Sequence, residues 1–271
     1  GGRVDYFRKT ASRLGIATEA ASLRWLAAAE AEGGAPVARL GEVGETWLTT
    51  VRLRPGRATP EAAAAFGRAL AATHRAGADW FGAPPPGLVG DGDLAGVPLP
   101  MRQAPPSCWG EFYATDRILP YVRIGFDRGA LDSRDVGVLE RLCNRLTDGE
   151  WDSPQPHGCP SAARVHGDLW GGNVLWAIGQ DVPGHETEDT FGVLIDPAAH
   201  GGHAETDLAA LAVFGSPSLP RTIAAYNEVA PLADGWESRV TLHQIHMLAV
   251  HVALFGGSYG PQTVSAAGRY L

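Results

Sequence analysis

The chain has 271 residues, of which 45% are hydrophobic and 19% are charged, and its formal net charge is −8. These values describe a globular protein that is long enough to form one large domain or two lobes with a cleft between them. The negative charge and the absence of a Lys/Arg run argue against a nucleic-acid partner. No apolar run is long enough to cross a bilayer, so we expect no membrane span and no membrane partner.

The three cysteines, Cys108, Cys143 and Cys159, are odd in number and have no CxxC spacing. This pattern argues against a disulfide framework and against a thiolate zinc site. The first ten residues, GGRVDYFRKT, contain neither an apolar signal core nor an amphipathic targeting helix. A reducing cytoplasm is therefore the compartment that we expect.

A strand followed by a helix is predicted at the N-terminus. Residues 3–9 alternate in character and include β-branched and aromatic residues, which predicts a strand that ends near Lys9. Thr18, the run EAASLRWLAAAEAE and Gly33 then predict an N-cap, an amphipathic helix opened by Glu19, and a glycine stop.

Two extended segments, residues 37–43 and 46–53, come next, and the run RPGRATP then breaks the pattern. We place a lobe boundary at this break. Residues 1–53 would form an N-lobe that binds nucleotide, and residues 54–271 would form a C-lobe with the catalytic and acceptor groups.

The rest of the chain is mainly helical by pattern. Thr59 with Pro60 begins a helix that ends near Gly77, and residues 82–106, rich in glycine and proline, are expected to form an irregular ordered loop. Further helices are predicted at residues 109–128 with a bend near Pro120, and at 132–147, 205–214, 217–229 and 236–255. Between them, GNVLWAI and FGVLID predict the two strands of a hairpin.

The strongest chemical signal is HGDLWGGNVLW at residues 166–176, followed by VLIDP at 193–197. A carboxylate, an amide five positions later and a second carboxylate at a strand end are what phosphoryl transfer from MgATP requires in a kinase cleft. Asp168 would orient an acceptor hydroxyl, whereas Asn173 and Asp196 offer hard oxygen ligands for Mg²⁺. Each residue alone also fits a turn-capping role, but their order and spacing together favour catalysis.

Lys9 is the single lysine among 22 basic residues. A site that contacts phosphates through a point charge needs a compact ammonium, which Lys provides and Arg does not. A lysine that remains by chance in an arginine-rich sequence would look the same. A strand lysine that contacts the α and β phosphates of ATP and is oriented by a helix carboxylate gives Lys9 and Glu19 a shared role. Glu19 alone also fits a favourable charge near a helix N-terminus.

Several motifs make the chain resemble the fructosamine kinase family, also called ketosamine 3-kinases. They are HGDLWGGN, IDPAAHGGHAETDLA, LHQIHMLAVHVALFGGSY, RKT with EAASLRWL, LAATHRAGADWFG and WGEFYATDRILPY, which together cover nearly the whole chain. The resemblance implies an α+β, bilobal, protein-kinase-like fold with a small β-rich N-lobe and a larger, mainly helical C-lobe. An HGDxxxxN motif alone would also be compatible with aminoglycoside and choline kinases.

The resemblance implies that ATP and Mg²⁺ are used to phosphorylate the sugar-derived O3 hydroxyl of a ketosamine, which is a product of amine glycation. The phosphorylated adduct is unstable and releases the amine, so the reaction begins deglycation of small amines or of glycated protein amines. Related bacterial members often favour ribulosamines or erythrulosamines over fructosamines.

The resemblance also assigns residues. It implies that Asp168 is the catalytic aspartate, that Asn173 and Asp196 hold the metal, and that Asp207 braces the catalytic loop together with His166. Lys9 matches the lysine that contacts the phosphates.

The adenine base is expected to pair with an extended hinge at Thr50, Val51 and Arg52. An acidic residue is common at this hinge in the family, and Val51 stands here instead. The family's glycine-rich hairpin before the lysine strand is missing, because only Gly1 and Gly2 precede RVDYFRK. We expect the natural chain to supply this hairpin upstream of Gly1.

Acceptor-binding residues follow from weaker signals. Trp170, inside the catalytic loop, would either stack against a sugar face or fill the core. His203, His251, Trp109 and Tyr259 are further candidates for the ketosamine pocket, and each also fits a purely structural role.

The histidines raise a metal hypothesis, because His243 and His246 lie three apart on a predicted helix and His200 and His203 follow Asp196. No HExxH motif or cysteine partner accompanies them, so packed or hydrogen-bonded histidines are the better interpretation.

Two other functions remain open from the sequence. The shared HGD core is compatible with an aminoglycoside or other amino-sugar kinase. The missing glycine-rich segment is compatible with a noncatalytic pseudokinase, although the base and both metal ligands are present.

Overall fold

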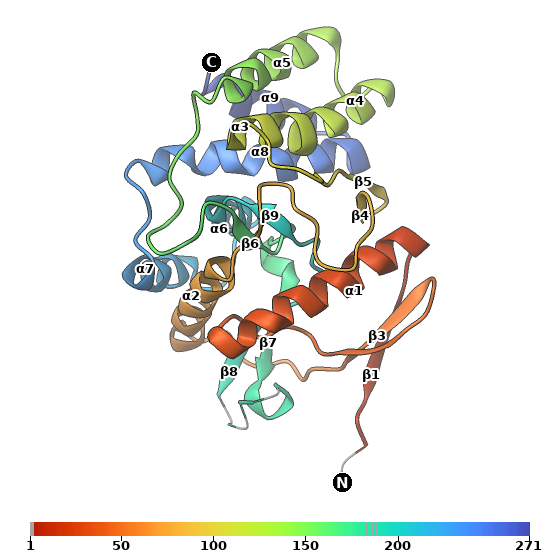
Figure 1. The fold of residues 1–271 in the computed structure, drawn as a ribbon, viewed down its shortest axis with the longest axis vertical. Coiled ribbons are helices and arrows are strands. Elements are labelled where there is room, and N and C mark those ends of the chain that lie inside the picture. Colours follow the sequence, from red (N-terminus) through yellow and green to blue (C-terminus); the bar gives the residue numbers. More distant parts are fainter. Residues whose placement is uncertain (1–2, 183, 186, 188) are drawn as a thin grey trace.

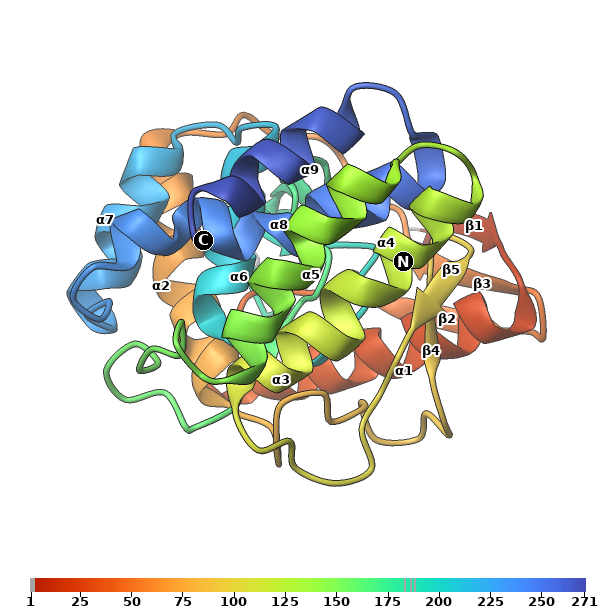
Figure 2. The same ribbon diagram turned by 90° about the horizontal axis from the view of Figure 1, so that it is seen from above.

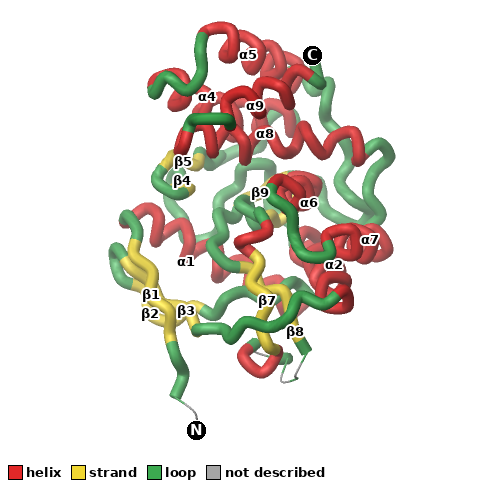
Figure 3. The backbone as a smooth tube through the Cα atoms, turned by 180° about the vertical axis from the view of Figure 1, so that it is seen from behind, coloured by secondary structure: helices red, strands yellow, loops and turns green. Residues whose placement is uncertain are grey.

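The computed structural model describes residues 3–182, 184–185, 187 and 189–271. A small antiparallel sheet and helix α1 (Arg13–Ala28) lie near one end of the molecule, close to the N-terminus, and a group of helices lies at the other end, close to the C-terminus (Figures 1 and 3). The protein therefore has the α+β arrangement of a small β-rich part and a larger helical part.

The N-terminal sheet has the strand order β1-β3-β2, with β1 at Tyr6–Thr10, β2 at Leu40–Val43 and β3 at Trp47–Val51. Neighbouring strands are antiparallel, and Lys9 on β1 lies opposite Leu48 on β3. The three extended segments that the sequence predicts are confirmed, with shorter bounds.

The predicted N-cap of the first helix is wrong. Helix α1 begins at Arg13, because Ser12 accepts a hydrogen bond from the backbone N–H of Gly15 through its hydroxyl oxygen at 3.0 Å. Thr18 lies within the helix, where its hydroxyl donates to the carbonyl of Leu14. Glu19 is consequently inside the helix and not in its first turn, so a first-turn charge does not explain it.

The helical part contains most of the elements that the sequence predicts. The helices are α2 (Pro60–Arg75), α3 (Trp109–Phe112), α4 (Leu119–Asp127), α5 (Ser133–Thr147), α6 (Ala204–Val213), α7 (Leu219–Val229), α8 (Trp236–Phe255) and α9 (Tyr259–Gly268), with short 3₁₀ turns at Ala29–Glu32, Gly171–Asn173 and Gly179–Asp181. Helix α8 packs against α4, α6 and α9 (Figure 2). Within the described ranges, no helix combines the length and the apolar character needed to cross a bilayer.

Three antiparallel strand pairs complete the fold. They are β4 (Gly92–Leu94) with β5 (Val97–Leu99), β6 (Ala163–Val165) with β9 (His200–Gly202), and β7 (Val174–Ile178) with β8 (Thr190–Leu194). The β7–β8 hairpin is the one predicted between the catalytic motif and the second aspartate. The other two pairs and helix α9 were not predicted.

The bend expected near Pro120 is a π-helical segment, Tyr113–Ile118, between α3 and α4. Proline has no N–H to donate to the carbonyl of Asp116, four residues earlier. The guanidinium of Arg117 donates to that carbonyl instead, at 3.0 Å. The side chain thus satisfies a backbone group that the proline leaves without its helical partner.

The segment between α1 and β2 is joined to the β7–β8 hairpin. The N–H of Leu194 donates to the carbonyl of Pro36 at 2.8 Å, and the carbonyl of Leu194 accepts from Ala38 at 3.0 Å. Leu26 and Leu194 lie fully buried in one hydrophobic cluster with residues of α2, α6 and α7. The catalytic motifs therefore sit where the two parts meet, while the boundary after residue 53 stays a prediction.

Five buried histidines are held neutral. Burial, as the largest cause, lowers the pKa of His166, His200, His203, His243 and His246, and for His246 to about 3. An unfolded histidine binds a proton near pH 6.5. Each group therefore contributes stability at neutral pH that is lost as pH falls from about 6.5 toward its folded pKa.

We predict that the free energy of unfolding falls between pH 7.5 and pH 5.5, by about 1.4 kcal/mol in total over this interval for each histidine that stays neutral. His246→Gln should remove one histidine's share of this pH dependence, because Gln binds no proton in the unfolded state. Gln can also keep the hydrogen bond to the carbonyl of Arg117, so the fold should be retained. Urea unfolding at several pH values measures the slope. The difference between the two proteins isolates His246 from buried carboxyl groups, and equal slopes would contradict its neutrality in the fold.

Candidate active site

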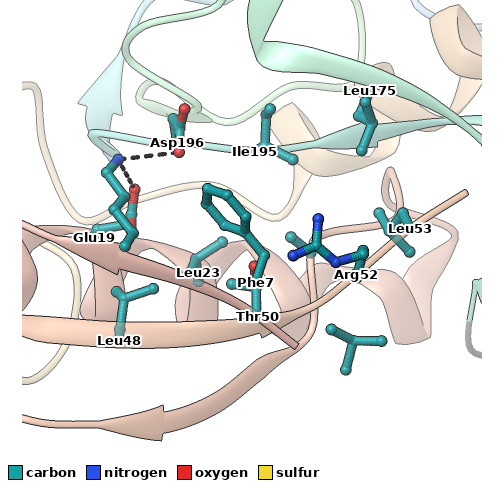
Figure 4. Close-up of a pocket in the computed structure, with 13 residues that line it drawn as sticks. Phe7, Glu19, Leu23, Leu48, Thr50, Arg52, Leu53, Leu175, Ile195 and Asp196 are labelled. Atoms are coloured by element: carbon teal, nitrogen blue, oxygen red, sulfur yellow. Dashed lines mark hydrogen bonds and ion pairs between the residues drawn. The ribbon is translucent and has the colours of Figure 1, made fainter. Parts of the chain in front are cut away.

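Two adjoining cavities lie between the N-terminal sheet, α1 and the segments around the β7–β8 hairpin. The first, of about 270 Å³, is lined mainly by apolar side chains of β1, α1, β3 and β7 (Figure 4). The second, of about 490 Å³, is lined by the start of α1, the β4–β5 turn and residues 166–173, which we call the catalytic loop after the role that the sequence predicts for it. Lys9, Glu19 and Asp196 line both cavities and mark their junction.

Lys9 is bound by two carboxylates from different elements. Its Nζ lies 2.7 Å from Oε1 of Glu19 on α1 and 3.1 Å from Oδ1 of Asp196 after β8 (Figure 4). Burial opposes the charge on this ammonium, but the hydrogen bonds and charges of Glu19 and Asp196 outweigh burial and raise the pKa of Lys9. Lys9 is therefore a fixed, protonated cation at the junction of the cavities.

The catalytic loop brings Asp168 and Asn173 together. The amide nitrogen of Asn173 donates to the backbone carbonyl of Asp168 at 2.8 Å and to its carboxylate at 3.2 Å, which leaves the Asn173 side-chain oxygen available. Burial, followed by the negative charge of Asp196, raises the pKa of Asp168 to about 7. A half-buried carboxyl group with such a pKa, lining a cavity, is typical of a group that handles protons in a reaction.

A buried network fixes the backbone of this loop. The carboxylate of Asp207 accepts from the backbone N–H groups of His166 and Gly167 at 2.9 and 3.2 Å, and it also contacts Nε2 of His74 at 2.8 Å. His166 accepts from the N–H of Asp168 and its Nε2 contacts the carbonyl of Ile195 at 2.7 Å. His166 and Asp207 thus lie where a loop brace is expected.

Asp196 is held in an unusual backbone conformation. Its φ is +50°, a left-handed region that a non-glycine residue rarely adopts. Such strain, of about 1–2 kcal/mol, is commonly found at functional sites. The turn directs the half-exposed carboxylate to Lys9 and into the junction between the cavities.

Asn173 and Asp196 fit a divalent cation by their chemistry. Both offer oxygen atoms to the same cavity, and Asp196 is paired only with Lys9 among the described residues. Hard oxygen donors, one of them anionic, are the ligands that Mg²⁺ prefers.

Thr50, Val51 and Arg52 line the apolar cavity, where the hinge is expected. The N–H of Val51 already donates to the carbonyl of Arg39, and that of Arg52 donates to Asp5. These two donors are engaged in the fold, so a nucleotide base in this cavity would have to use other backbone groups of the segment.

The candidate acceptor residues separate into three groups. Trp170 lines the larger cavity and is 37% exposed, which excludes the core-filling alternative. Trp109 and His203 are fully buried within the helical part, edge to face with 5.9 Å between their ring centroids, and neither lines the two cavities. Their role in a ketosamine pocket stays a prediction. His251 and Tyr259 contact each other near the rim, and neither lines the two cavities.

Some lining residues were not predicted. Phe7 and Leu53 line the apolar cavity, and Asp93 on β4 lines the larger one. Asp93 is placed by α1, since its N–H donates to the hydroxyl of Thr18 at 3.0 Å. The only sequence signal for it is the pair of carboxylates in DGD, within a loop that otherwise shows no periodicity.

A second group of side chains could in principle hold a metal. His203, Glu205 and His243 place one ligand atom each within 4.8 Å of one another. Arg239, however, already binds both carboxylate oxygens of Glu205 at 2.9 Å. His203 accepts from the N–H of Glu205 through Nδ1, so its Nε2 carries the proton. The geometry supports packed and hydrogen-bonded histidines.

Comparisons with solved structures define the class of fold. The fold is similar to that of the aminoglycoside phosphotransferase APH(2'')-Ib, with a TM-score of 0.58 over the whole chain and 92% of that chain, and to choline kinase LicA from Streptococcus pneumoniae, with a TM-score of 0.59 over 99% of this chain and 86% of that one. Both are only 12% identical in sequence, so they show the fold alone. The chain has the protein-kinase-like fold of these small-molecule kinases.

The chain belongs to the fructosamine kinase family, whose model matches residues 2–271. It is 32% identical to a probable ketoamine kinase of Thermus thermophilus, over 84% of this chain and 74% of that protein, and 29% identical to one of Enterococcus faecium, over 82% and 72%. A crystal structure from Thermobifida fusca, assigned as a fructosamine-3-kinase, is 41% identical with a TM-score of 0.82, over 98% of this chain and 85% of that one. The predicted family is therefore confirmed.

Gly171 offers a test of how tightly the catalytic loop is packed. A Cβ on Gly171 would lie 2.2 Å from the carbonyl oxygen of Gly215. We predict that Gly171→Ala displaces the loop and lowers kcat about 10- to 100-fold, since small misplacements of reacting groups have effects of this size. Steady-state kinase assays measure it.

The matched control is Gly137→Ala in α5, where a Cβ meets no atom within 4 Å. It should leave kcat unchanged and stabilise the fold by up to about 1 kcal/mol. Wild-type kcat in Gly171→Ala would show that the loop tolerates a shift.

Proposed function

We propose that this protein is an ATP-dependent kinase that phosphorylates the O3 hydroxyl of ketosamines and so begins deglycation. The observation that carries the proposal is the meeting of Lys9, Asp168, Asn173 and Asp196 around one cavity, in a chain of the fructosamine kinase family. A reducing compartment suits the three cysteines, which are all free thiols.

The apolar cavity is suited to the adenine of ATP. Phe7, Leu23 and Leu175 give it apolar walls, and the segment from Thr50 to Leu53 also lines it. Lys9, at the inner end, would bind the α and β phosphates while Glu19 holds its ammonium in place. The phosphates would then extend from this junction into the larger cavity.

Asn173 and Asp196 would hold Mg²⁺ beside these phosphates. The cation, when bound, offsets the negative charge that develops during phosphoryl transfer. The protein's own part is to present two oxygen ligands from separate elements, the catalytic loop and the turn after β8, at one cavity.

Asp168 would orient the acceptor hydroxyl. As the hydroxyl oxygen forms a bond with the γ-phosphorus, the bond from phosphorus to the β,γ-bridging oxygen breaks, ADP leaves, and the hydroxyl proton passes to the Asp168 carboxylate. A pKa of about 7 suits this carboxyl group to accept and later release a proton near neutral pH.

The charge of the larger cavity favours a cationic acceptor. Asp93, Asp168, Asp196 and Glu19 contribute four carboxyl groups, against the single ammonium of Lys9. A ketosamine carries a secondary amine that is protonated at neutral pH, whereas a simple sugar has no such charge. This feature supports an amine-bearing acceptor but does not separate ketosamines from aminoglycosides.

A substrate panel tests the proposal. With MgATP, the protein should consume ATP in the presence of ribulosamines or fructosamines, release ADP and form a 3-phosphorylated product. Asp168→Asn should lower kcat at least about 100-fold with little change in ATP affinity, because the amide cannot accept the proton. Coupled ADP release and phosphorus NMR of the product provide the measurements.

Failure of every ketosamine to react would reject the proposed substrate class. Turnover of aminoglycosides with inert ketosamines would assign the protein to the amino-sugar kinases. Undiminished phosphoryl transfer in Asp168→Asn would show that this carboxylate has another role.

A further inference from the structure

A row of aromatic side chains continues outward from the larger cavity. Trp170 lines the cavity, and its ring centroid lies 6.0 Å from that of Phe214 in an edge-to-face arrangement. Phe214 lies 5.2 Å from His251, which in turn lies 5.6 Å from Phe255 and 4.9 Å from Tyr259. We call these five residues the aromatic ridge.

The ridge is unusually exposed for large apolar side chains. The exposed fractions are 37% for Trp170, 48% for Phe214 and 68% for Phe255. Contiguous apolar surface next to a cavity commonly marks a binding site. Exposed fractions of this size show that these three rings do not fill the core.

The backbone holds the inner end of the ridge in place. A Cβ on Gly172 would lie 2.1 Å from the Trp170 ring, so this glycine lets the indole fold over the catalytic loop. The close contact of Gly171 with the carbonyl of Gly215 fixes the neighbouring residue, Phe214, against the same loop. Close backbone packing at Gly171 and Gly172 therefore positions the rings of Trp170 and Phe214.

The five residues of the ridge include no carboxylate, ammonium or guanidinium group. His251 is its one titratable imidazole, and Nδ1 lies 2.7 Å from the carbonyl of Met247, an acceptor, so Nδ1 carries the proton. The imidazole lies beside three other rings of the ridge, those of Phe214, Phe255 and Tyr259. Such a surface suits a flat apolar group better than an ion.

We propose that the aromatic ridge binds the aglycone of the ketosamine, meaning the group that bears the glycated amine, and that it selects aromatic or other large apolar aglycones. This inference rests on the proposed function. The amine substituent is not part of the sugar that Asp168 orients, so it extends beyond the reacting part of the cavity. Trp170 is the ridge residue that lines the larger cavity, so it directs the substituent from the cavity along the ridge.

Paired ketosamines provide the test. The ribulosamines of phenylethylamine and of methylamine share the reacting sugar and differ in the aglycone. We expect kcat/KM to be about tenfold higher for the aromatic compound, mainly through a lower KM, which is the usual scale of discrimination by apolar contacts. Phe214→Ala and Phe255→Ala should bring the ratio of the two kcat/KM values close to one.

Phe126→Ala is the matched control, since Phe126 on α4 is 47% exposed and lies outside the ridge and both cavities. It should keep the wild-type ratio. Turnover of both compounds with a ratio near one in the wild type would overturn the ridge assignment and leave the kinase proposal intact. No turnover of either would overturn both.

Sedimentation of the same variants tests whether a second copy of the chain, and not the aglycone, occupies the ridge. A wild-type dimer that Phe255→Ala converts to a monomer, without a change in the kcat/KM ratio, would assign the ridge to a second copy of the chain and overturn the proposal. An unchanged oligomeric state with a lost ratio supports it.

Discussion

The ammonium of Lys9 joins two consecutive elements, β1 and α1, to the turn after β8, in which Asp196 lies 187 residues from Lys9. Strand β1 supplies the lysine, α1 supplies Glu19 at 2.7 Å, and the turn after β8 supplies Asp196 at 3.1 Å. Because this group lies at the junction of both cavities, it fixes how the sheet faces the catalytic loop. Two carboxylates around one cation leave a net negative charge there, which a divalent cation would balance.

The catalytic loop depends on the buried network beneath it. Asp207 accepts two backbone N–H groups of the loop and contacts His74, whose other ring nitrogen contacts Tyr226. The helical part therefore carries the loop as a rigid unit. The strained Asp196 and the raised pKa of Asp168 occur where this rigid support meets the cavity, which is where function commonly displaces residues from their most stable state.

Local sequence patterns predicted the helices and strands whose formation depends on local interactions. Periodicity and capping are sufficient to predict the β7–β8 hairpin, α2 with its Thr59 cap, and α8. The sequence also indicates that Asp168, Asn173 and Asp196 lie close together, because one loop and the hairpin that follows it carry all three. The start of α1 was wrong because Ser12 and Thr18 are both good caps, and only packing selects between them. The sequence did not reveal that Trp109 and His203 are buried away from both cavities, or that Asp93 lines the larger one, because tertiary contacts decide which aromatic and acidic side chains reach a cavity.

A crystal structure with Mg²⁺, a non-hydrolysable ATP analogue and a ribulosamine tests the central claim most directly. The account predicts metal–oxygen distances of about 2.0–2.1 Å to Asn173 and Asp196, the Lys9 ammonium on the α and β phosphates, and the O3 hydroxyl within hydrogen-bonding distance of Asp168. A nucleotide bound outside the apolar cavity, or a metal ion held by other side chains, would contradict it.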